Sequence, residues 1–205
     1  MERFADIEIL RYELTGFEKL NLREKRLVYC LSQATLWGRD ITFDQYGAYN
    51  LKIRQLLECI YTYFVEEKCV DEDYAHLVVY LKRIWFSNGI HHHYSGMKIQ
   101  PGFSREYFVR LVKSVPAEKN ALLETTNIDV LLDELLPVMF DEDVMPQRVN
   151  HSDGEDLVAT SASNYYEGVT DAEVQAYYNE KKQADDKPSW GLNSRLSKKD
   201  GVLCE

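Results

Sequence analysis

Three consecutive histidines followed by a tyrosine are the residues of this sequence best suited to chemistry. His91, His92, His93 and Tyr94 come shortly after Asn88, so three of the five histidines lie in one short segment. Neutral imidazoles bind transition metals, and imidazole and phenol groups also bind polar ligands. In an extended loop, His91 and His93 point to one side and His92 points to the other. The segment therefore predicts a metal site, a ligand-binding surface, or a loop that forms hydrogen bonds and packs on aromatic rings.

A metal site at this segment needs at least one more ligand, because zinc takes three or four protein side chains. His151 or Glu155 would have to supply it, and a small metalloprotein that uses His91, His93 and His151 is one alternative reading. The sequence contains no H-E-x-x-H motif and no regular spacing of His and Cys. It also contains no G-x-S-x-G motif that would present a nucleophile. We therefore predict neither metal ligands nor catalytic residues within this chain.

Composition limits the classes of partner. The 205 residues carry a formal net charge of −10, and no basic patch is visible, so nucleic-acid binding is disfavoured. No apolar run approaches the roughly 18 residues of a membrane span. The first residues are charged and lack a signal-peptide core, which favours a cytoplasmic location and leaves an exported one open. The four cysteines are expected to be reduced thiols, with Cys30 and Cys59 on apolar helix faces.

The elements that must position the histidine segment are helices. Asn21 is a predicted N-cap with Glu24 three residues later, and Asn88 with the following glycine is a predicted helix end. The first helix should bury Leu27, Cys30, Leu31, Ala34 and Trp37, which recur at spacings of three and four. The segment Asp40–Tyr46 is expected to be a connection. Apolar periodicity and caps predict five helices, over 21–37, 49–68, 71–87, from Ser104 to before Pro116, and from Asn127 to Pro137, which should bend or stop the last one.

The C-terminal part has a different pattern. Thr170 and Glu173 have the spacing of a capping box before another helix. Apolar residues alternate from Trp190 to Leu196, and Asp200 with the glycine after it is a strong hairpin signal. A lone two-stranded hairpin is unstable, and no other strand is evident upstream, so we expect a natural chain that continues further. The predicted fold is a mainly α-helical α+β chain, with a helical segment over residues 1–189 and the first strands of a further unit over 190–205.

Five separated stretches together resemble one enzyme family. They are LVYCLSQA at Leu27–Ala34, WGRDI at Trp37–Ile41, WFSNGIHHHY at Trp85–Tyr94, SASNYY at Ser161–Tyr166 and GLNSRL at Gly191–Leu196. Their order and spacing are similar to those of the N-terminal part of dipeptidyl peptidase III, in its Bacteroides-like bacterial branch. The resemblance covers nearly the whole chain.

This resemblance implies a fragment of a two-lobed zinc exopeptidase that releases dipeptides from the N-termini of short peptides. The chain would form the first part of the lower lobe, and its C-terminal β-hairpin would begin a small β-barrel. The family's zinc ligands lie on an H-E-x-x-G-H motif and a later E-E-x-[KR]-A-D-like segment, and this chain contains neither. Zinc is therefore expected in the full-length enzyme and not here. The chain alone should be inactive, and its partners would be short peptides and the remaining C-terminal part of the same polypeptide.

The resemblance also implies a substrate contact. In the family, the loop before a Lys-x-x-Pro step contributes an aromatic side chain to the cleft. Here the step is Lys98–Pro101 and the matching aromatic is Tyr94, with Asn88, His91 and His93 near it as substrate-binding residues. The alternative reading is a stand-alone helical module whose His/Tyr loop binds a peptide or protein partner.

Overall fold

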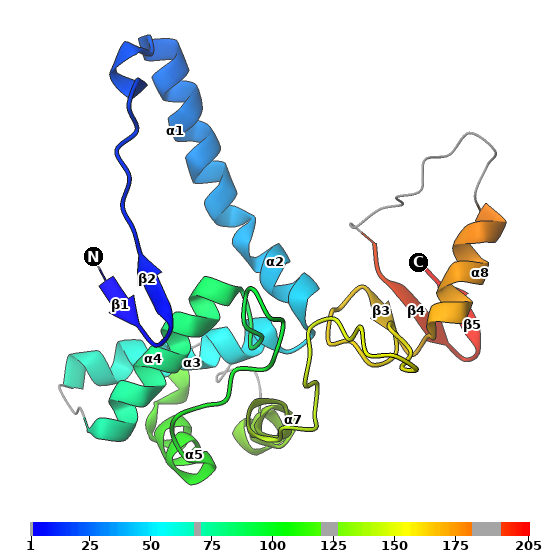
Figure 1. The fold of residues 1–205 in the computed structure, drawn as a ribbon. Coiled ribbons are helices and arrows are strands. Elements are labelled where there is room, and N and C mark those ends of the chain that lie inside the picture. Colours follow the sequence, from blue (N-terminus) through cyan, green and yellow to red (C-terminus); the bar gives the residue numbers. More distant parts are fainter. Residues whose placement is uncertain (1, 68–70, 120–126, 182–193) are drawn as a thin grey trace.

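The computed structural model describes residues 2–67, 71–119, 127–181 and 194–205. The described chain is mainly helical with two small sheets, which confirms the predicted α+β class at that level. Figure 1 shows a helical body, a long arm that projects from it, and a smaller C-terminal unit beside it. No helix in the described ranges combines the length and the apolarity that crossing a lipid bilayer requires.

The body is built from α3 (Asn50–Glu67), α4 (Glu72–Ser87), α5 (Arg105–Ser114) and α7 (Ile128–Phe140), as the apolar periodicity predicted. Side-chain caps start three of these helices: Asp71 accepts from the backbone N–H of Tyr74, Ser104 from that of Tyr107, and Asn127 from those of Asp129 and Val130. The core combines side chains of all four helices, with these among the fully buried members: Ile53, Leu56, Leu57, Ile60, Leu77, Leu81, Ile84, Phe108, Leu131 and Leu135.

Pro137 does not stop α7, contrary to one part of the prediction. The helix continues through Phe140 with the proline inside it. Val138 and Met139, which follow the proline, are both buried. Burial of these side chains offsets the loss of one backbone hydrogen bond, which is what proline costs inside a helix.

The segment predicted to be a connection is a helix, α2 (Arg39–Tyr46). Its central side chain, Phe43, is 2% exposed and lies beneath the guanidinium of Arg54 on α3, 4.6 Å from the ring centroid. The same guanidinium forms an ion pair of 2.8 Å with Asp40. These contacts come from another helix, so local propensity gave little sign of this one.

The helix α1 (Leu22–Trp37) begins as predicted but is not buried. Asn21 and Glu24 form the predicted capping box. No residue of α1 is buried, although the sequence predicted an inward stripe that included Cys30; of the two predicted apolar-face cysteines, Cys59 is buried and Cys30 is exposed. The helix projects from the body, and an extended segment returns to its tip through a 3-10 turn at Phe17–Lys19 (Figure 1).

A hairpin at the N-terminus was not predicted. β1 (Glu2–Phe4) pairs antiparallel with β2 (Ile7–Ile9), and Ala5 between them has a φ of 49°. Phe4 and Ile7 are buried, and the ammonium of Lys82 on α4 pairs with Glu2 at 2.7 Å. The strands are three residues each, too short for alternation to be read from sequence.

The C-terminal unit contains the predicted hairpin. β4 (Leu196–Lys199) and β5 (Val202–Cys204) pair antiparallel, and the two turn residues Asp200 and Gly201 have φ of 51° and 81°, as a type I′ turn requires. The alternating residues Trp190 and Leu192 lie outside the described residues. The helix α8 (Asp171–Lys181) starts with the predicted reciprocal bonds of Thr170 and Glu173.

The expectation that no upstream strand accompanies the C-terminal hairpin was wrong. β3 (Tyr166–Glu167) pairs in parallel with β4, so the hairpin does have a third strand within the chain. Val169, Val174 and Leu196 form a second hydrophobic cluster between this sheet and α8. A two-residue strand carries no periodic signal, and only the pairing reveals it. The idea that this sheet begins a small barrel stays a prediction.

Candidate functional site

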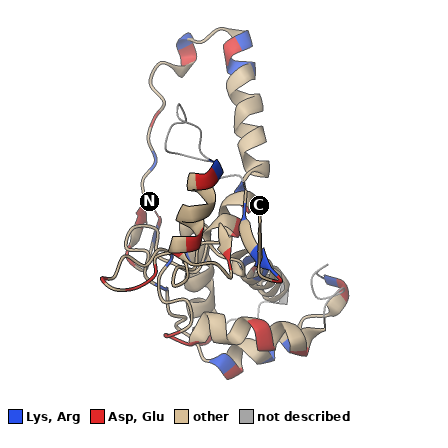
Figure 2. Ribbon diagram, turned by 90° about the vertical axis from the view of Figure 1, so that its right-hand side faces the viewer, with Lys and Arg blue, Asp and Glu red and all other residues tan. Residues whose placement is uncertain are grey.

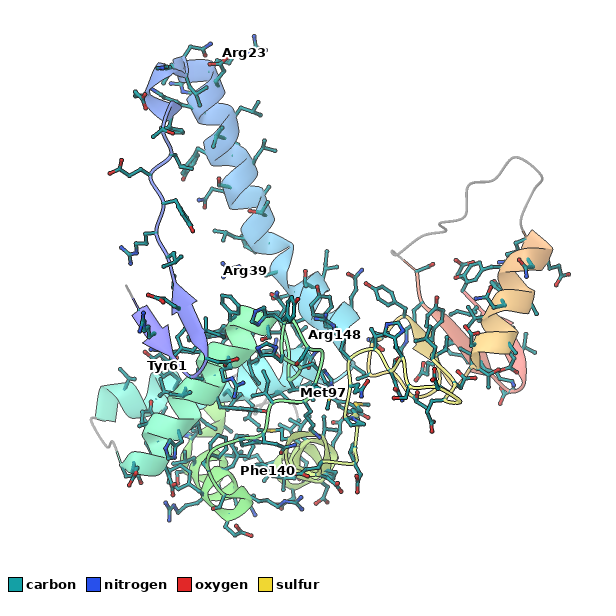
Figure 3. The ribbon with its side chains drawn as sticks, viewed as in Figure 1. Arg23, Arg39, Tyr61, Met97, Phe140 and Arg148 are labelled. Carbon is teal, nitrogen blue, oxygen red and sulfur yellow. The ribbon has the colours of Figure 1, made fainter. Side chains whose placement is uncertain are left out.

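The histidine segment is a tight backbone hairpin rather than an open loop. The backbone N–H of Ile99 donates to the carbonyl of Ile90 at 2.8 Å. The backbone N–H of His92 donates to the carbonyl of Met97, also at 2.8 Å. A second segment reinforces the hairpin, because the backbone N–H of Lys98 donates to the carbonyl of Pro146 at 2.9 Å. Met97 also lies across from residue 147 in an antiparallel bridge, and Figure 3 shows Met97 beside this second segment. The tip of the hairpin is thus held from two sides.

His91 is a buried structural residue. It is 2% exposed, and its Nε2 lies 2.8 Å from the carbonyl oxygen of Met145. Nε2 must therefore carry the proton and donate, since a carbonyl only accepts. Burial lowers the pKa of His91 to about 4, and the positive charges of Lys98 and Arg148 add to the lowering. The ring is therefore neutral at pH 7 and almost fully closed off from solvent.

His92 joins the hairpin to the N-terminus. Its Nδ1 accepts from the backbone N–H groups of Tyr94 at 3.3 Å and Ser95 at 3.1 Å. Nε2 then carries the proton and donates to a carboxylate oxygen of Asp6 at 3.0 Å. Both ring nitrogens are used, so His92 shapes the turn that precedes Tyr94.

His93 and Tyr94 are the exposed members of the segment. The ring of His93 packs edge-on against Phe86, with 4.7 Å between centroids, and lies 4.3 Å from the ring of His92. Tyr94 is 90% exposed. In the part of the chain that is described, no hydrogen bond involves its hydroxyl group. An aromatic ring that is largely exposed on a hydrogen-bonded hairpin is available to a ligand or to another protein surface.

Asn88 begins the segment, and a backbone hydrogen bond fixes it at the end of α4. It has a left-handed conformation, with φ of 55°, and its N–H donates to the carbonyl of Ile84 as the C-cap of α4. Gly89 follows with φ of 150°, and a Cβ at this position would lie 2.3 Å from the amide nitrogen of Asn50. The buried Asn50 donates to the carbonyl of Phe43 and accepts from the N–H of Ile90 at 3.1 Å. This amide ties α2 and α3 to the start of the hairpin.

Lys98 fixes the other end of the hairpin. Its ammonium donates to the carbonyls of Asp141 at 2.5 Å and Val144 at 2.7 Å. Asp141 is the C-cap of α7, so the positive charge lies where the helix carbonyls are concentrated. Burial lowers the pKa of Lys98. The Lys98–Pro101 step that the resemblance singled out therefore anchors the hairpin.

A pocket of about 670 Å³ lies beside the segment, between the N-terminal hairpin and α2–α4. Asn88 contributes to its wall, whereas Tyr94, His91 and His93 do not. Its lining combines aromatic and charged side chains, which are Glu2, Phe4, Ile9, Arg39, Phe43, Arg54, Glu58, Lys82, Trp85, Phe86 and Asn88. Of the four site residues predicted from sequence, Asn88 thus lines a pocket, His93 and Tyr94 are exposed, and His91 is buried and supports the hairpin.

Sequence reasoning missed most of this pocket. Trp85 is 39% exposed, and its indole N–H donates to Glu58 at 2.7 Å. The available signal was the helical spacing of Arg54 and Glu58, which form an ion pair of 3.4 Å one turn apart on α3. Nothing in the sequence indicated that the N-terminal hairpin closes the other side.

The metal alternative finds no support in the geometry. Over the described ranges, no group of three or more His, Cys, Asp or Glu side chains is placed to hold a metal ion. In particular, His91, His93 and His151 do not form such a group.

Comparisons with known proteins add no relative. The chain matches no protein-family model, and it has no significant match among curated proteins.

Proposed function

We propose that this chain is the N-terminal part of a zinc-dependent dipeptidyl peptidase, in which it contributes to the lower lobe and to the substrate cleft. The resemblance of the five sequence stretches to dipeptidyl peptidase III carries this proposal. In it, the zinc and the chemistry at the metal belong to the C-terminal remainder of the polypeptide. The hairpin Asn88–Tyr94 then contributes to the binding of short peptides.

The exposure of Tyr94 is the structural observation that best supports this role. Its ring is 90% exposed, while the residues before it are fixed by the bonds of His91 and His92. A rigid aromatic side chain loses little conformational entropy when a ligand packs on it. In this proposal His91 and His93 do not touch the peptide directly but hold the hairpin that presents Tyr94.

The proposal is tested on the complete gene product. Tyr94→Ala should raise KM for a dipeptidyl-naphthylamide by about fivefold, because a lost aromatic contact is worth roughly 1 kcal/mol, with zinc content unchanged. Tyr12→Ala is the matched control, since Tyr12 is 81% exposed but lies on the projecting arm. Equal effects of the two substitutions would refute the role of Tyr94. Purified 1–205 should release no product with added zinc, and clear turnover by this chain would contradict the proposal.

A second candidate is a stand-alone helical interaction module. The exposed apolar surface of α1 favours it, because no residue of this helix is buried. The gene sequence beyond Glu205 separates the two candidates. An open reading frame that reaches an H-E-x-x-G-H motif supports the peptidase, and an immediate stop codon supports the module.

A further inference from the structure

The pocket between the N-terminal hairpin and the helices combines an aromatic surface with charged side chains. Phe43 forms a buried wall, Trp85 and Phe86 are partly exposed on α4, and Phe4 with Ile9 closes the pocket from the hairpin. Its volume of about 670 Å³ is in the range of small-molecule sites, roughly 300 to 1,000 Å³. Aromatic walls of this kind bind apolar groups and fix their orientation through a few polar contacts.

The charged side chains of the pocket are paired, with one exception. The ammonium of Lys82 pairs with Glu2 at 2.7 Å. Arg54 pairs with Asp40 at 2.8 Å and approaches Glu58 at 3.4 Å. Arg39 forms no hydrogen bond, ion pair or ring contact with any described residue. Among the described residues, the pocket therefore presents one positive charge without a partner, on a chain whose formal net charge is −10.

Arg39 lies at the foot of α1, on the side of the N-terminal arm, as Figure 3 shows. It is the first residue of α2, the helix that carries Phe43 on the pocket wall. The guanidinium and the aromatic surface thus belong to one lining. A guanidinium offers a planar pair of donors that match the two oxygens of a carboxylate.

We infer that this pocket binds a carboxylate attached to an apolar, preferably aromatic, group. The carboxylate pairs with Arg39, and the apolar group packs against Trp85 and Phe86. A singly charged anion fits Arg39, which has no partner among the described residues, whereas the carboxylates of Glu2 and Glu58 in the lining oppose a phosphate. The inference stands apart from the peptidase proposal, because it depends on the pocket alone.

Calorimetric titration of the 205-residue chain with two matched probes tests this inference. N-acetyl-L-phenylalanine carries the carboxylate, and N-acetyl-L-phenylalaninamide lacks it. The acid should bind with a Kd on the order of 1 mM, given ordinary ligand efficiency. It should bind about tenfold more tightly than the amide, because hydrogen bonds between charged partners are the stronger ones. Equal affinities, or no binding of the acid at about ten times that concentration, would overturn the inference.

Substitution of the arginine locates the site. Arg39→Gln should reduce the affinity for the acid to that for the amide, while Arg39→Lys should retain part of the preference. Arg23→Gln is the control, because Arg23 lies at the far end of α1 (Figure 3) and should leave binding unchanged. Equal weakening by Arg23→Gln and Arg39→Gln would show a non-local charge effect and refute the site. Circular dichroism of each variant establishes that it is folded.

Two sources could supply this chemistry, a free aromatic acid or the C-terminal residue of a peptide. N-acetyl-Ala-Ala-Phe with a free carboxylate separates them. Tighter binding of this peptide than of the single residue identifies a chain end as the natural ligand. Equal or weaker binding identifies a free small acid.

Discussion

The helices α4 and α1 have the same length, 16 residues, and opposite surroundings. α4 buries six residues, Tyr74, Leu77, Tyr80, Leu81, Ile84 and Ser87, whereas α1 buries none. Both carry apolar residues at spacings of three and four. The difference teaches that such spacing predicts a helix with an apolar side and does not predict which element covers that side.

The surface of α1 exposes large apolar side chains along most of the helix. From Leu27 to Gly38 the sequence has no charged residue, and Figure 2 shows charges on α1 only near its outer end. Leu31 is 57% exposed and Trp37 is 88% exposed. Large exposed apolar surfaces mark interaction sites. In the peptidase proposal, the remaining polypeptide covers this helix.

The largest effect should come from truncating the core of α4. Leu81→Ala removes a side chain that is fully buried in the main hydrophobic core. The free energy of unfolding should fall by about 4 kcal/mol, as for other fully buried leucines. Urea denaturation measures it. A loss below about 1 kcal/mol would show that the body is less tightly packed than the structure indicates.

The second prediction concerns the hairpin that leaves α4. His91 has a pKa of about 4 when folded and an ordinary value of 6.5 when unfolded. The unfolded chain therefore binds the additional proton between these values, so stability falls as pH drops from about 6.5 to 4. The loss attributable to His91 should approach about 3 kcal/mol. His91→Gln keeps a donor for Met145 and cannot titrate, so denaturation at pH 7 and pH 4 should show a smaller loss in this variant. An equal loss in both proteins would contradict buried, neutral His91.

The third effect should be smaller and tests the junction of α4 with the hairpin. Gly89→Ala places a Cβ 2.3 Å from the buried amide of Asn50, which bonds to Phe43 and Ile90. Gly96→Ala is the matched control, since Gly96 also has positive φ but meets no atom within 4 Å. Gly89→Ala should cost about 2 kcal/mol more than the control in thermal or urea unfolding. Equal costs would mean that the Asn50 amide is not a fixed contact.

The smallest effect should be found on α1. Leu31→Ala removes the same side chain as the first prediction, from a residue that is 57% exposed. The free energy of unfolding should change by no more than about 0.5 kcal/mol. A loss of 2 kcal/mol or more in the isolated chain would show that α1 is covered in solution and would remove the contrast with α4.

The candidate site was predictable from sequence in part. The end of α4 at Asn88 and the rarity of three adjacent histidines drew attention to the right segment, and Tyr94 is exposed there. The separate roles of the histidines were not predictable. His91 is buried and bonds to Met145, more than fifty residues later in the chain, and His92 bonds to Asp6 near the N-terminus.

The sequence by itself determined the local elements: the capped helices, the Asp200 turn and the apolar sides of α3 and α4. Each depends on side chains within a few residues of one another, where propensity and capping act. The tertiary structure decided α2, the strand pairing of β3, the exposure of α1 and the pocket around Arg39. These depend on contacts between distant segments, such as Arg54 with Phe43, whose energies no local pattern contains.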